Sequence, residues 1–567
     1  MRVTANSDVL KARAIAGTYV VILAWDFMPG QTEKRKGLLG FAIERTEFDK
    51  DDVIVESYWM RSIKRFRDKD KSYAPGTPVS TADHPIQSFQ WGDYTARAGT
   101  RYEYKIVPTY GTPKLLKLDA DSSVTLDVRT EPEYGDLADV DSAGPVRHDI
   151  FFNRGVIGSQ AYAREPFGNI EPDPNAPTSA PMVWLSRGLF EALLRMIAYA
   201  KDEKFALRAA LYEFHYQPVA NAFAKAVEAG VDVKIVYDAE SSYKVENQAT
   251  IGRAGLDATD SVIPRTVSEG IRHNKFVVLL KGDVPIAVWT GSTNISDGGI
   301  FGHSNVGHMV WDETVAKAYL DYWTRLSQNL TSTKLRPLNR AATPTPAGKP
   351  PKNSVTALFS ARDEKDSNAT LQWYADRMAE AKKIVCITVA FNLDEVFQQV
   401  IAQENDVLRY IVKDDDLGDG ESVGHDRDVI FAAGGYLGEG ALANFLRERS
   451  NPLNSNDYIH TKFMLVDPLT DDPLVVTGSA NFSRPSQRIN DENMLVIRGD
   501  KRVADIYFGE YMRIFDHHYA RYVVRKLQAA GEGDPNAGYL KDKAEDWVPS
   551  HFNTSSYKAK RRKYFVG

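Results

Sequence analysis

The sequence is poor in cysteine, in long apolar runs and in excess charge of either sign. Cys386 is the single cysteine among 567 residues, which excludes an internal disulfide framework and cysteine-based zinc sites and favours a reducing compartment. No apolar run reaches the roughly 20 residues that a membrane-spanning helix needs. A formal net charge of -6 argues against a basic surface along the whole chain, although a local positive cleft is still possible. We therefore expect a soluble, cytoplasmic protein.

The apolar segment Ala14–Trp25 is the one candidate for a targeting signal, because Lys11 and Arg13 precede it. No small-residue cleavage site follows this segment, as a secretory signal would require. Its β-branched and aromatic residues, closed by a turn near Pro29 and Gly30, instead predict a buried strand.

Residues 1–135 carry short alternating runs separated by Gly, Pro and Asp, a pattern that predicts an amino-terminal β-sandwich. The run that contains Tyr102 resembles the tyrosine-corner strand of a fibronectin type III domain, with Tyr102 as the corner residue. This resemblance implies a module that contacts a partner protein or supports a neighbouring domain.

Two proline-rich segments, 164–181 and 341–354, are too dense in proline for helices and read as connectors. At this length several domains are expected. We predict a connector at 136–180, a first α/β unit at 181–340, a linker at 341–354, a second α/β unit at 355–530 and a tail at 531–567.

The two α/β units are internal repeats of one another. Each is expected to open with a helix and to continue as strand, helix and strand before a long loop. The expected elements are Leu185–Ala200, Phe205–Phe214 and Val231–Tyr237 in the first repeat, and Ala369–Lys382, Ile384–Phe391 and Val407–Val412 in the second.

A group of chemically distinctive residues recurs in both repeats at a constant offset of 187 positions. Each repeat has a histidine and a lysine separated by one residue, followed by a Gly-Ser-x-Asn sequence that we expect to form a tight turn. One isolated copy would be read as polar residues capping the end of a buried strand, but the repetition favours a shared function. The pairs are His273 and His460, Lys275 and Lys462, Gly291 and Gly478, Ser292 and Ser479, and Asn294 and Asn481.

These residue types suit the chemistry of a phosphodiester. On a strand the histidine and lysine of each pair point to the same face. Two lysines and two asparagine amides can neutralise and bind the phosphoryl oxygens. Two histidines can serve as nucleophile and as acid for the leaving oxygen. The glycines permit tight turns and the serines orient neighbours, so neither a metal nor another cofactor is expected.

The pattern H-x-K-x4-D followed by G-S-x-N, present twice, resembles the phospholipase D superfamily over about residues 180–525. The resemblance implies two α/β repeats packed as a pseudo-dimer around one site, a phosphohistidine intermediate and no metal. It makes His273 the nucleophile and His460 the acid. Members of the family cleave phospholipids, nucleic acids or other phosphodiesters.

The second repeat fits this family pattern better than the first. Asp467 supplies the motif aspartate, which the family uses structurally, and Glu492 stands where a carboxylate polarises a histidine. The first repeat has Leu280 and Asn305 at the corresponding positions, because 467 − 187 = 280 and 492 − 187 = 305. Whether Glu492 serves its own repeat or reaches the other one stays open at this point.

Other polar groups carry weaker signals. The acidic segment 414–428 reads as a solvated or lid loop rather than a metal loop. The basic cluster 558–563 could contact nucleic acid or anionic lipid headgroups, or could be a charged tail without a partner. Trp547, Tyr557 and Phe565 could attach this tail to the body of the protein. We read His303, His308 and His425 as ordinary polar or core residues.

The leading hypothesis is a metal-independent phosphodiester hydrolase that acts on phospholipid headgroups, with some transfer to alcohols. The alternative is a nuclease of the same superfamily, and a non-catalytic binding scaffold is the third reading. Expected partners are the phosphodiester substrate, a membrane surface touched peripherally, and a protein bound by the amino-terminal module.

Overall fold

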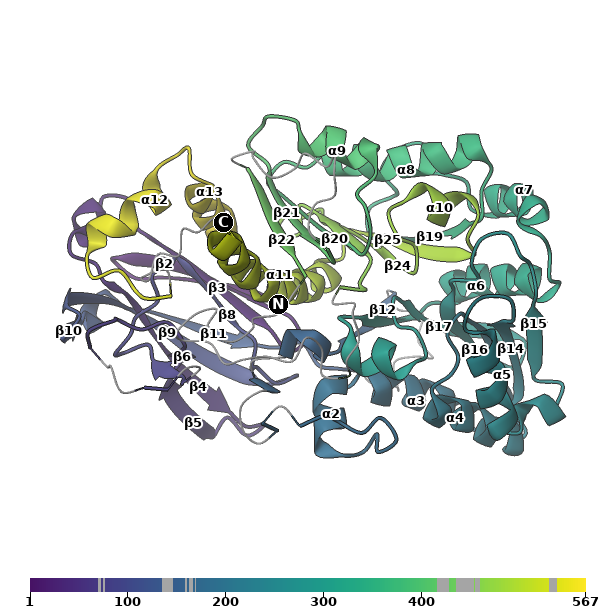
Figure 1. Cartoon of the computed structure of the whole chain (residues 1–567). Helices are drawn as coiled ribbons and strands as arrows, with labels where there is room; N and C mark the ends of the chain where they lie inside the picture. The colour runs from purple at the N-terminus through teal and green to yellow at the C-terminus, as the bar shows by residue number, and fades with distance from the viewer. Residues whose placement is uncertain are drawn as a thin grey trace.

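The computed structural model shows an amino-terminal β domain beside two α/β repeats, and the long helix α11 (Lys501–Ala529) runs between these parts (Figure 1). The chain begins in the β domain and, after the second repeat, returns to it through its last helices. The structure describes residues 1–69, 73–74, 77–134, 146–158, 161–162, 167–168, 170–415, 428–434, 453, 459–529 and 538–567.

Two antiparallel sheets form the amino-terminal domain, as predicted for a β-sandwich. Their apolar side chains share one core with the carboxyl-terminal residues Trp547 and Val548. One sheet has the order β1-β2-β3-β8 and the other β10-β9-β4-β5, with β11 also pairing with β9. The strands are β1 (Arg2–Asn6), β2 (Leu10–Ala16), β3 (Val21–Phe27), β4 (Gly40–Phe48), β5 (Ile54–Trp59), β8 (Gln90–Asp93), β9 (Arg101–Thr112), β10 (Leu115–Leu118) and β11 (Val124–Arg129), with the small pair β6 (Arg61–Ser62) and β7 (Val79–Ser80) beside them.

The segment Ala14–Trp25 is buried β structure, as predicted, but it forms parts of two strands instead of one. β2 and β3 pair antiparallel, with Ile15 opposite Ile22. The amide of Gly17 donates to the carbonyl of Val20 at 2.9 Å and closes the turn between them. Apolar content predicted the burial, but it could not reveal a turn inside an apolar run.

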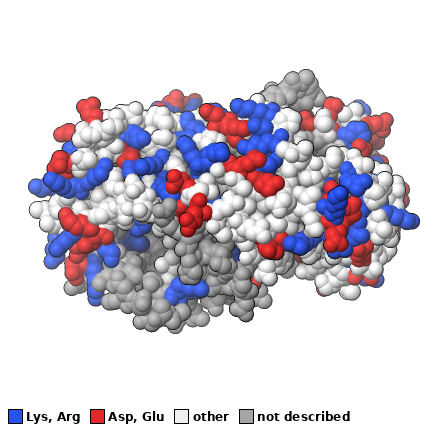
Figure 2. Space-filling view, turned by 90° about the horizontal axis from the view of Figure 1, so that it is seen from above, with Lys and Arg blue, Asp and Glu red and all other residues white. Residues whose placement is uncertain are grey.

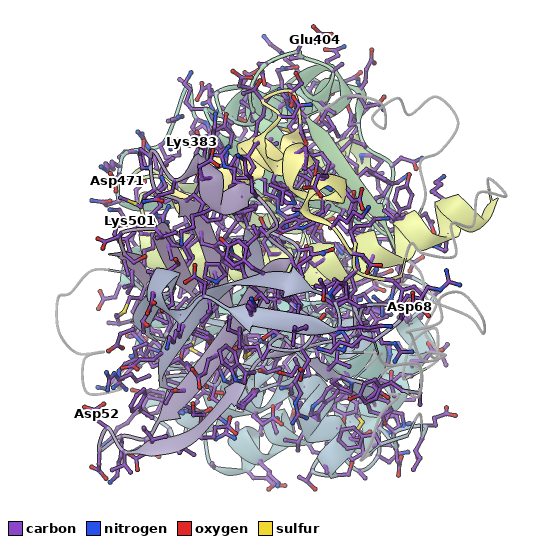
Figure 3. All side chains as sticks on the ribbon, turned by 90° about the vertical axis from the view of Figure 1, so that its left-hand side faces the viewer. Asp52, Asp68, Lys383, Glu404, Asp471 and Lys501 are labelled. Carbon is purple, nitrogen blue, oxygen red and sulfur yellow. The ribbon has the colours of Figure 1, made fainter. Side chains whose placement is uncertain are left out.

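Tyr102 lies on β9 and is fully buried. Its hydroxyl accepts a hydrogen bond from the backbone amide of Arg97 at 2.9 Å, which is the kind of contact that a tyrosine corner makes. Membership of the fibronectin type III family remains a prediction. Figure 3 looks onto this domain, with Asp52 labelled in the turn between β4 and β5.

The two repeats contain sheets of the same size and strand order. The first sheet runs β12-β18-β17-β16-β13-β14-β15, and the second runs β19-β25-β24-β23-β20-β21-β22. Three neighbouring strands in each are parallel and the others antiparallel, so both sheets are mixed, as expected. The first comprises β12 (Arg147–Phe152), β13 (Phe205–Leu211), β14 (Asp232–Asp238), β15 (Val262–Arg265), β16 (Lys275–Lys281), β17 (Val284–Gly291) and β18 (Val306–Trp311). The second comprises β19 (Ser354–Ser360), β20 (Ile384–Val389), β21 (Leu408–Lys413), β22 (Val429–Ala433), β23 (Phe463–Val466), β24 (Leu474–Gly478) and β25 (Glu492–Arg498).

One face of each sheet contributes to a common core, which also takes in the apolar sides of α6 and α11. The outer face of the first sheet is covered by α3 and α4, and that of the second by α8 and α9. The two repeats therefore pack sheet face toward sheet face, as the pseudo-dimer model predicts. The helices are α2 (Ala180–Ser186), α3 (Leu189–Tyr199), α4 (Gln217–Glu228), α5 (Lys244–Arg253), α6 (Glu313–Ser327), α7 (Ser332–Ala342), α8 (Glu364–Ala379), α9 (Glu395–Ile401), α10 (Arg484–Arg488), α12 (Val548–Phe552) and α13 (Tyr557–Val566).

The helix expected at Leu185–Ala200 is broken into α2 and α3. Arg187 and Gly188 both have positive φ, 52° and 88°, between the two helices. The Arg187 guanidinium forms an ion pair with Glu510 of α11 at 2.9 Å. A tertiary ion pair therefore accompanies a break that helical periodicity alone did not reveal.

The region predicted as a connector at 136–180 contains a strand of the first repeat. Residues 147–152 form β12, which pairs with β18 at the edge of the sheet. The proline-rich stretch lies after this strand. The start of the first repeat, predicted from composition at residue 181, was therefore placed too late in the sequence. Strand β12 is buried almost throughout, which explains why it belongs to the repeat's core.

The predicted tail at 531–567 is folded against the body where the structure describes it. Helix α13 lies against β3 of the amino-terminal domain and β21 of the second repeat. Trp547 and Phe565 are buried, as predicted. The cations of the basic cluster pair with groups distant in sequence: Lys560 with Asp428 at 2.7 Å, Arg562 with Asp26, and Arg561 with Gln90. Those three side chains stabilise the fold, which corrects the reading of the whole cluster as an open contact surface.

Among the described helices, none combines the length and the apolar character that crossing a membrane demands. Acidic and basic side chains also pair at the surface, as Lys501 and Asp471 do at 2.5 Å (Figure 3).

Candidate active site

The chemical residues of both repeats lie at the same end of equivalent central strands. Lys275 is the first residue of β16, and Lys462 directly precedes β23. Gly291 and Gly478 are the last residues of β17 and β24. The backbone joins the repeats here, because the amide of His460 donates to the carbonyl of Ser304 at 3.2 Å.

The two histidines meet at this junction. The ring centroids of His273 and His460 are 6.4 Å apart, with the ring planes at 70°. Each lysine lies on the same face as its histidine and donates to that histidine's backbone carbonyl, at 2.6 Å for Lys275 and 2.5 Å for Lys462. Two segments that are 187 residues apart thus contribute to one site.

Glu492 reaches across the interface to the histidine of the other repeat. Nδ1–H of His273 donates to Oε2 of Glu492 at 2.8 Å. The hydroxyl of Ser479 donates to the same oxygen at 2.8 Å, and the Asn490 amide donates to the other carboxylate oxygen at 3.3 Å. With Nδ1 occupied by this bond, Nε2 is the ring nitrogen left for substrate.

The first repeat builds the same arrangement around Asn305. Nδ1–H of His460 lies 3.0 Å from Oδ1 of Asn305 and 3.1 Å from the carbonyl oxygen of Ser292. The Ser292 hydroxyl donates to Oδ1 of Asn305 at 2.7 Å, and the Asn305 amide nitrogen donates to the carbonyl of Gly299 at 2.7 Å. Each histidine is therefore oriented by the opposite repeat, one by a carboxylate and the other by a neutral amide.

Burial and neighbouring cations favour neutral imidazoles in the free protein. Desolvation lowers the pKa of His273 to about 4, although Glu492 opposes this shift. The pKa of His460 is lowered well below its ordinary value by desolvation, with further contributions from Lys462, His303, Lys275 and His273. An anionic substrate would offset these positive charges and favour protonation of His460.

Lys275 is buried in the same site. Desolvation lowers its pKa to about 7, while Glu492 and Glu213 act in the opposite direction. The ammonium also lies 5.1 Å from the centroid of the Tyr212 ring. Lys275 therefore changes its charge close to neutral pH, unlike an exposed lysine.

The two asparagines of the Gly-Ser-x-Asn segments carry buried amide oxygens without a hydrogen-bond partner among the described residues. These are Oδ1 of Asn294 and Oδ1 of Asn481. The amide nitrogen of Asn294 donates to Glu213. Unsatisfied buried polar atoms are rare in folded proteins. Their presence in both repeats marks a polar site with two free acceptors, which a hydrogen-bond donor such as water or a substrate hydroxyl would satisfy.

The glycines of both segments are required by close backbone packing. A Cβ at Gly291 would lie 2.2 Å from the carbonyl oxygen of Val306, and one at Gly478 would lie 2.2 Å from that of Asn493. Gly291 also has a φ of 129°, a conformation that favours glycine. Neither position can carry a side chain without moving the strand that positions Asn305 or Glu492.

Asp467 makes structural contacts. Its carboxylate accepts hydrogen bonds from the backbone amides of Lys382, Lys383 and Ile384 at 2.7, 2.7 and 3.0 Å. This joins the end of β23 to the start of β20. Leu280 instead lies within β16, opposite Ala206.

Sequence reasoning missed Glu213 and misjudged His303. Glu213 follows β13 and accepts the hydrogen bond of Asn294. The ring of His303 lies 5.6 Å from that of His460, so our reading of His303 as an ordinary residue is corrected. Its position two residues before Asn305 was the available signal, as was the position of Glu213 directly beyond a buried strand.

The other two histidines that we read as ordinary residues are His308 and His425. His308 is a buried core residue that bonds to His148 at 2.8 Å and to the hydroxyl of Tyr507 at 3.0 Å, in keeping with its expected role. His425 lies outside the described residues.

The acidic segment 414–428 is described at its two ends alone. Asp414 accepts a hydrogen bond from the amide of Ile459 at 2.5 Å, next to His460. Asp428 pairs with Lys560. Asp415 is exposed, and the remaining acidic residues of the segment lie outside the described residues, so its role as a lid stays a prediction.

Two facing α/β repeats with one histidine–lysine pair each define a phosphodiesterase-type enzyme with a single site. Residues 193–327 and 375–518 match a family model described as cardiolipin synthase, PLD-like domain. The chain belongs to the phospholipase D superfamily.

Solved structures with a similar fold include two bacterial proteins. Phosphatidylserine synthase of Haemophilus influenzae Rd KW20 is 14% identical, with 63% of this chain and 94% of that chain covered and a TM-score of 0.42. The phospholipase D family member Nuc from Salmonella typhimurium is 21% identical, with 32% and 95% covered and a TM-score of 0.23. A comparison with curated proteins finds no match.

Proposed function

We propose that this enzyme hydrolyses phosphodiesters through a phosphohistidine at His273, with phospholipid headgroups as its substrates. The observation that carries the proposal is the hydrogen bond from His273 to Glu492 across the repeat interface. It fixes the tautomer that leaves the Nε2 lone pair free, and the lowered pKa keeps that imidazole neutral at physiological pH.

In the first step, Nε2 of His273 attacks phosphorus and forms a nitrogen–phosphorus bond. The bond from phosphorus to the departing oxygen breaks, and this oxygen takes a proton from the imidazolium of His460. Because His460 is neutral in the free protein, the step requires that it gain a proton when the anionic substrate binds. Glu492 stabilises the positive charge that develops on the ring of His273.

In the second step, the now neutral His460 removes a proton from water. The resulting oxygen nucleophile attacks phosphorus, and the bond to Nε2 of His273 breaks. The products are the phosphate monoester and the enzyme with His460 protonated again. His460 returns to its neutral form when the anionic product leaves. An alcohol in place of water gives transfer to a new phosphodiester by the same sequence.

The remaining site residues stabilise charge. Lys275 and Lys462 provide ammonium groups on the two sides of the site, and Asn294 and Asn481 provide amides. All four side chains are buried, so their electrostatic effect on a bound phosphoryl group is greater than it would be in water. No step in this scheme requires a metal ion.

An asymmetry next to the site favours a substrate with an apolar part. Val277 pairs with Ala209, and Met464, its counterpart at 277 + 187, pairs with Ile387. Four residues further along each strand stand Glu213 and Phe391. Phe391 is 61% exposed, so the second repeat presents an aromatic ring where the first presents a carboxylate.

The surface charge supports the same choice. Seen from above, acidic and basic side chains alternate over the described part of this face, without a continuous basic band (Figure 2). A long nucleic acid would favour such a band. Cleavage of DNA or RNA is the second candidate, favoured by the local positive charge of the two lysines. The cytoplasmic location stays a prediction from the sequence, based on its single cysteine and on the lack of a long apolar run and of a signal cleavage site.

One assay distinguishes these substrates. The full-length protein is incubated with phosphatidylcholine vesicles, single- and double-stranded DNA, and RNA, each with EDTA present. We expect release of the headgroup and no cleavage of nucleic acid. Cleavage of nucleic acid alone would replace the lipid proposal, and loss of all turnover with EDTA would contradict the metal-free scheme.

A variant refines the choice of substrate. Phe391→Ala should raise KM for vesicles several-fold and leave kcat for a short water-soluble phosphodiester unchanged. Leu115→Ala, which removes an exposed apolar side chain on β10 of the amino-terminal domain, is the matched control. Equal effects of Phe391→Ala on both substrates would remove the argument for an apolar contact.

A further inference from the structure

A second cavity lies far from the histidines, between the amino-terminal domain and the carboxyl-terminal helices. Its volume is about 1250 Å³, above the roughly 300–1,000 Å³ of ordinary small-molecule sites. The walls come from β5, β6 and β8 on one side and from α11, α12 and the start of α13 on the other. None of the catalytic candidates lines it.

Three lysines converge on this cavity from separate parts of the chain. Lys64 follows β6, Lys541 precedes α12 and Lys558 lies in the first turn of α13. None of their ammonium groups has an ion pair or hydrogen bond with another described residue. Lys560, two residues after Lys558, differs because it bonds to Asp428.

The lysines are close enough to repel one another. Lys64 is exposed to water in the cavity. Desolvation lowers its pKa, and the positive charges of Lys558 and Lys541 lower it further. Like charges held together without a counter-ion are unfavourable, and an anion between them would relieve the repulsion.

Most carboxylates at the cavity are engaged elsewhere. Glu56 bonds to Arg45 at 2.7 Å. Asp516 accepts a hydrogen bond from the Tyr94 hydroxyl at 2.6 Å. Asp546 remains on the wall against Lys64, Lys541, Lys558 and Arg61, so the lining keeps an excess of positive charge.

Part of the wall is aromatic. Tyrosine and tryptophan rings line both sides, and the indole N–H of Trp91 is buried without an acceptor among the described residues. Flat rings beside unpaired ammonium groups suit a ligand that combines a planar ring with phosphate. The rings belong to Tyr58, Trp91, Tyr519, Tyr539 and Trp547.

We propose that this cavity binds a nucleotide, with its phosphates between Lys64, Lys541 and Lys558 and its base against the aromatic wall. The site is independent of the phosphodiesterase site and of the function proposed for it. It gives the amino-terminal domain a ligand-binding role that the β-sandwich alone would not indicate.

The test is a titration of the full-length protein with ATP and AMP, followed by calorimetry and tryptophan fluorescence. The His273→Ala variant is used beside the wild type, because it removes turnover and leaves the cavity intact. We expect saturable binding of equal strength in both proteins. Failure of ATP to saturate at millimolar concentration would overturn the proposal, as would binding that His273→Ala abolishes.

Two further arms assign the contacts. The double variant Lys64→Gln with Lys558→Gln should weaken ATP binding at least tenfold, whereas the exposed Lys383→Gln should leave it unchanged. Lys541→Gln alone serves as a milder variant should the double variant be poorly folded. Unchanged ATP affinity in these cavity variants would refute the site.

A third set of titrations tests the class of ligand. Pyrophosphate and ribose 5-phosphate should bind at least tenfold more weakly than ATP and AMP, since they lack the base. Equal affinity for pyrophosphate and ATP would reduce the site to a simple anion site and overturn the nucleotide assignment.

Discussion

The two repeats have the same strand order and the same spacing of chemical residues, yet they equip the shared site differently. The second repeat supplies a carboxylate to His273 and the first supplies an amide to His460. At one further pair of equivalent positions, the first repeat has a carboxylate and the second an exposed aromatic ring. The unlike pairs are Glu492 and Asn305, Asp467 and Leu280, and Glu213 and Phe391.

This comparison shows how a symmetric fold can hold an asymmetric reaction. A serine hydroxyl donates to Glu492 and another to Asn305 at similar distances, 2.8 and 2.7 Å, so each histidine faces an acceptor that is held in place. The carboxylate adds a negative charge on the side of His273 alone. A nucleophile whose ring becomes positive in the phosphoenzyme benefits most from that charge, which supports the assignment of His273 as nucleophile.

The largest expected effect separates the two histidines. His273→Ala should reduce turnover about 10⁴-fold on any phosphodiester, because no nucleophile remains. His460→Ala should be equally impaired on a phospholipid. With bis(4-nitrophenyl) phosphate, whose leaving group needs no proton, it should recover a rapid burst of about one equivalent of 4-nitrophenol, followed by slow turnover because the second step still lacks its base.

The measurement is kcat on both substrates, together with acid-quench trapping of labelled phosphohistidine. The label should map to His273 in the wild type and in His460→Ala. Label on His460 in His273→Ala, or recovery in that variant with the activated substrate, would reverse the roles.

The next effect concerns the carboxylate that distinguishes the repeats. Glu492→Gln gives both histidines an amide and keeps the shape, so activity should fall about 100-fold, a loss typical of a residue that orients a catalytic group. The reverse change, Asn305→Asp, gives His460 a carboxylate and should alter kcat less than tenfold. If Glu492→Gln were no worse than Asn305→Asp, the chemical asymmetry of the repeats would have no catalytic meaning.

The two similar repeats and their shared active site could be predicted from the sequence, because five residue pairs recur at one constant offset. The partner of Glu492 could not be predicted. A constant offset relates the repeats but does not tell which surfaces meet, and the contact with His273 depends on their packing. The same limit applies to His303, which joins the site through the other repeat.

Contacts between distant segments explain the remaining misses. Strand β12 enters the first sheet from beyond a region of connector-like composition, and the cations of α13 find Asp26 and Asp428 more than a hundred residues away. Local sequence patterns reveal neither the neighbouring strand of β12 nor the acidic partners of these cations. The β-sandwich, in contrast, was accessible because alternation and turn residues are local signals.

The pH dependence of kcat/KM should show smaller effects, with a change of about tenfold per pH unit on each side of the profile. Attack requires neutral His273, so kcat/KM should fall as pH drops through about 4. Proton donation requires protonated His460, and phosphate binding requires charged Lys275. The pKa of His460 lies well below its ordinary value, so kcat/KM should decline as pH rises and fall more steeply above about 7, where Lys275 loses its charge. The profile of kcat/KM reports these groups in the free enzyme.

The variant Glu492→Gln tests both limbs at once. Glu492 raises the pKa of His273 and of Lys275, so its neutralisation should move both limbs to lower pH. Lys317→Gln, an exposed lysine paired with Asp321 on α6, should leave the profile unchanged. Limbs that stay fixed in Glu492→Gln would mean that other groups titrate.

The smallest effect concerns stability and the one motif residue that the first repeat lacks. Asp467→Ala removes the acceptor of three backbone amides and places alanine at a φ of 49°, so unfolding free energy should drop by about 1–3 kcal/mol. Asp467→Asn keeps an acceptor and tolerates that φ, so it should lose less. Turnover per folded molecule should be unchanged in both, measured after denaturant titration. A large loss of kcat in a fully folded Asp467→Asn protein would show that this aspartate acts on the reaction, and that the first repeat works without a group the second needs.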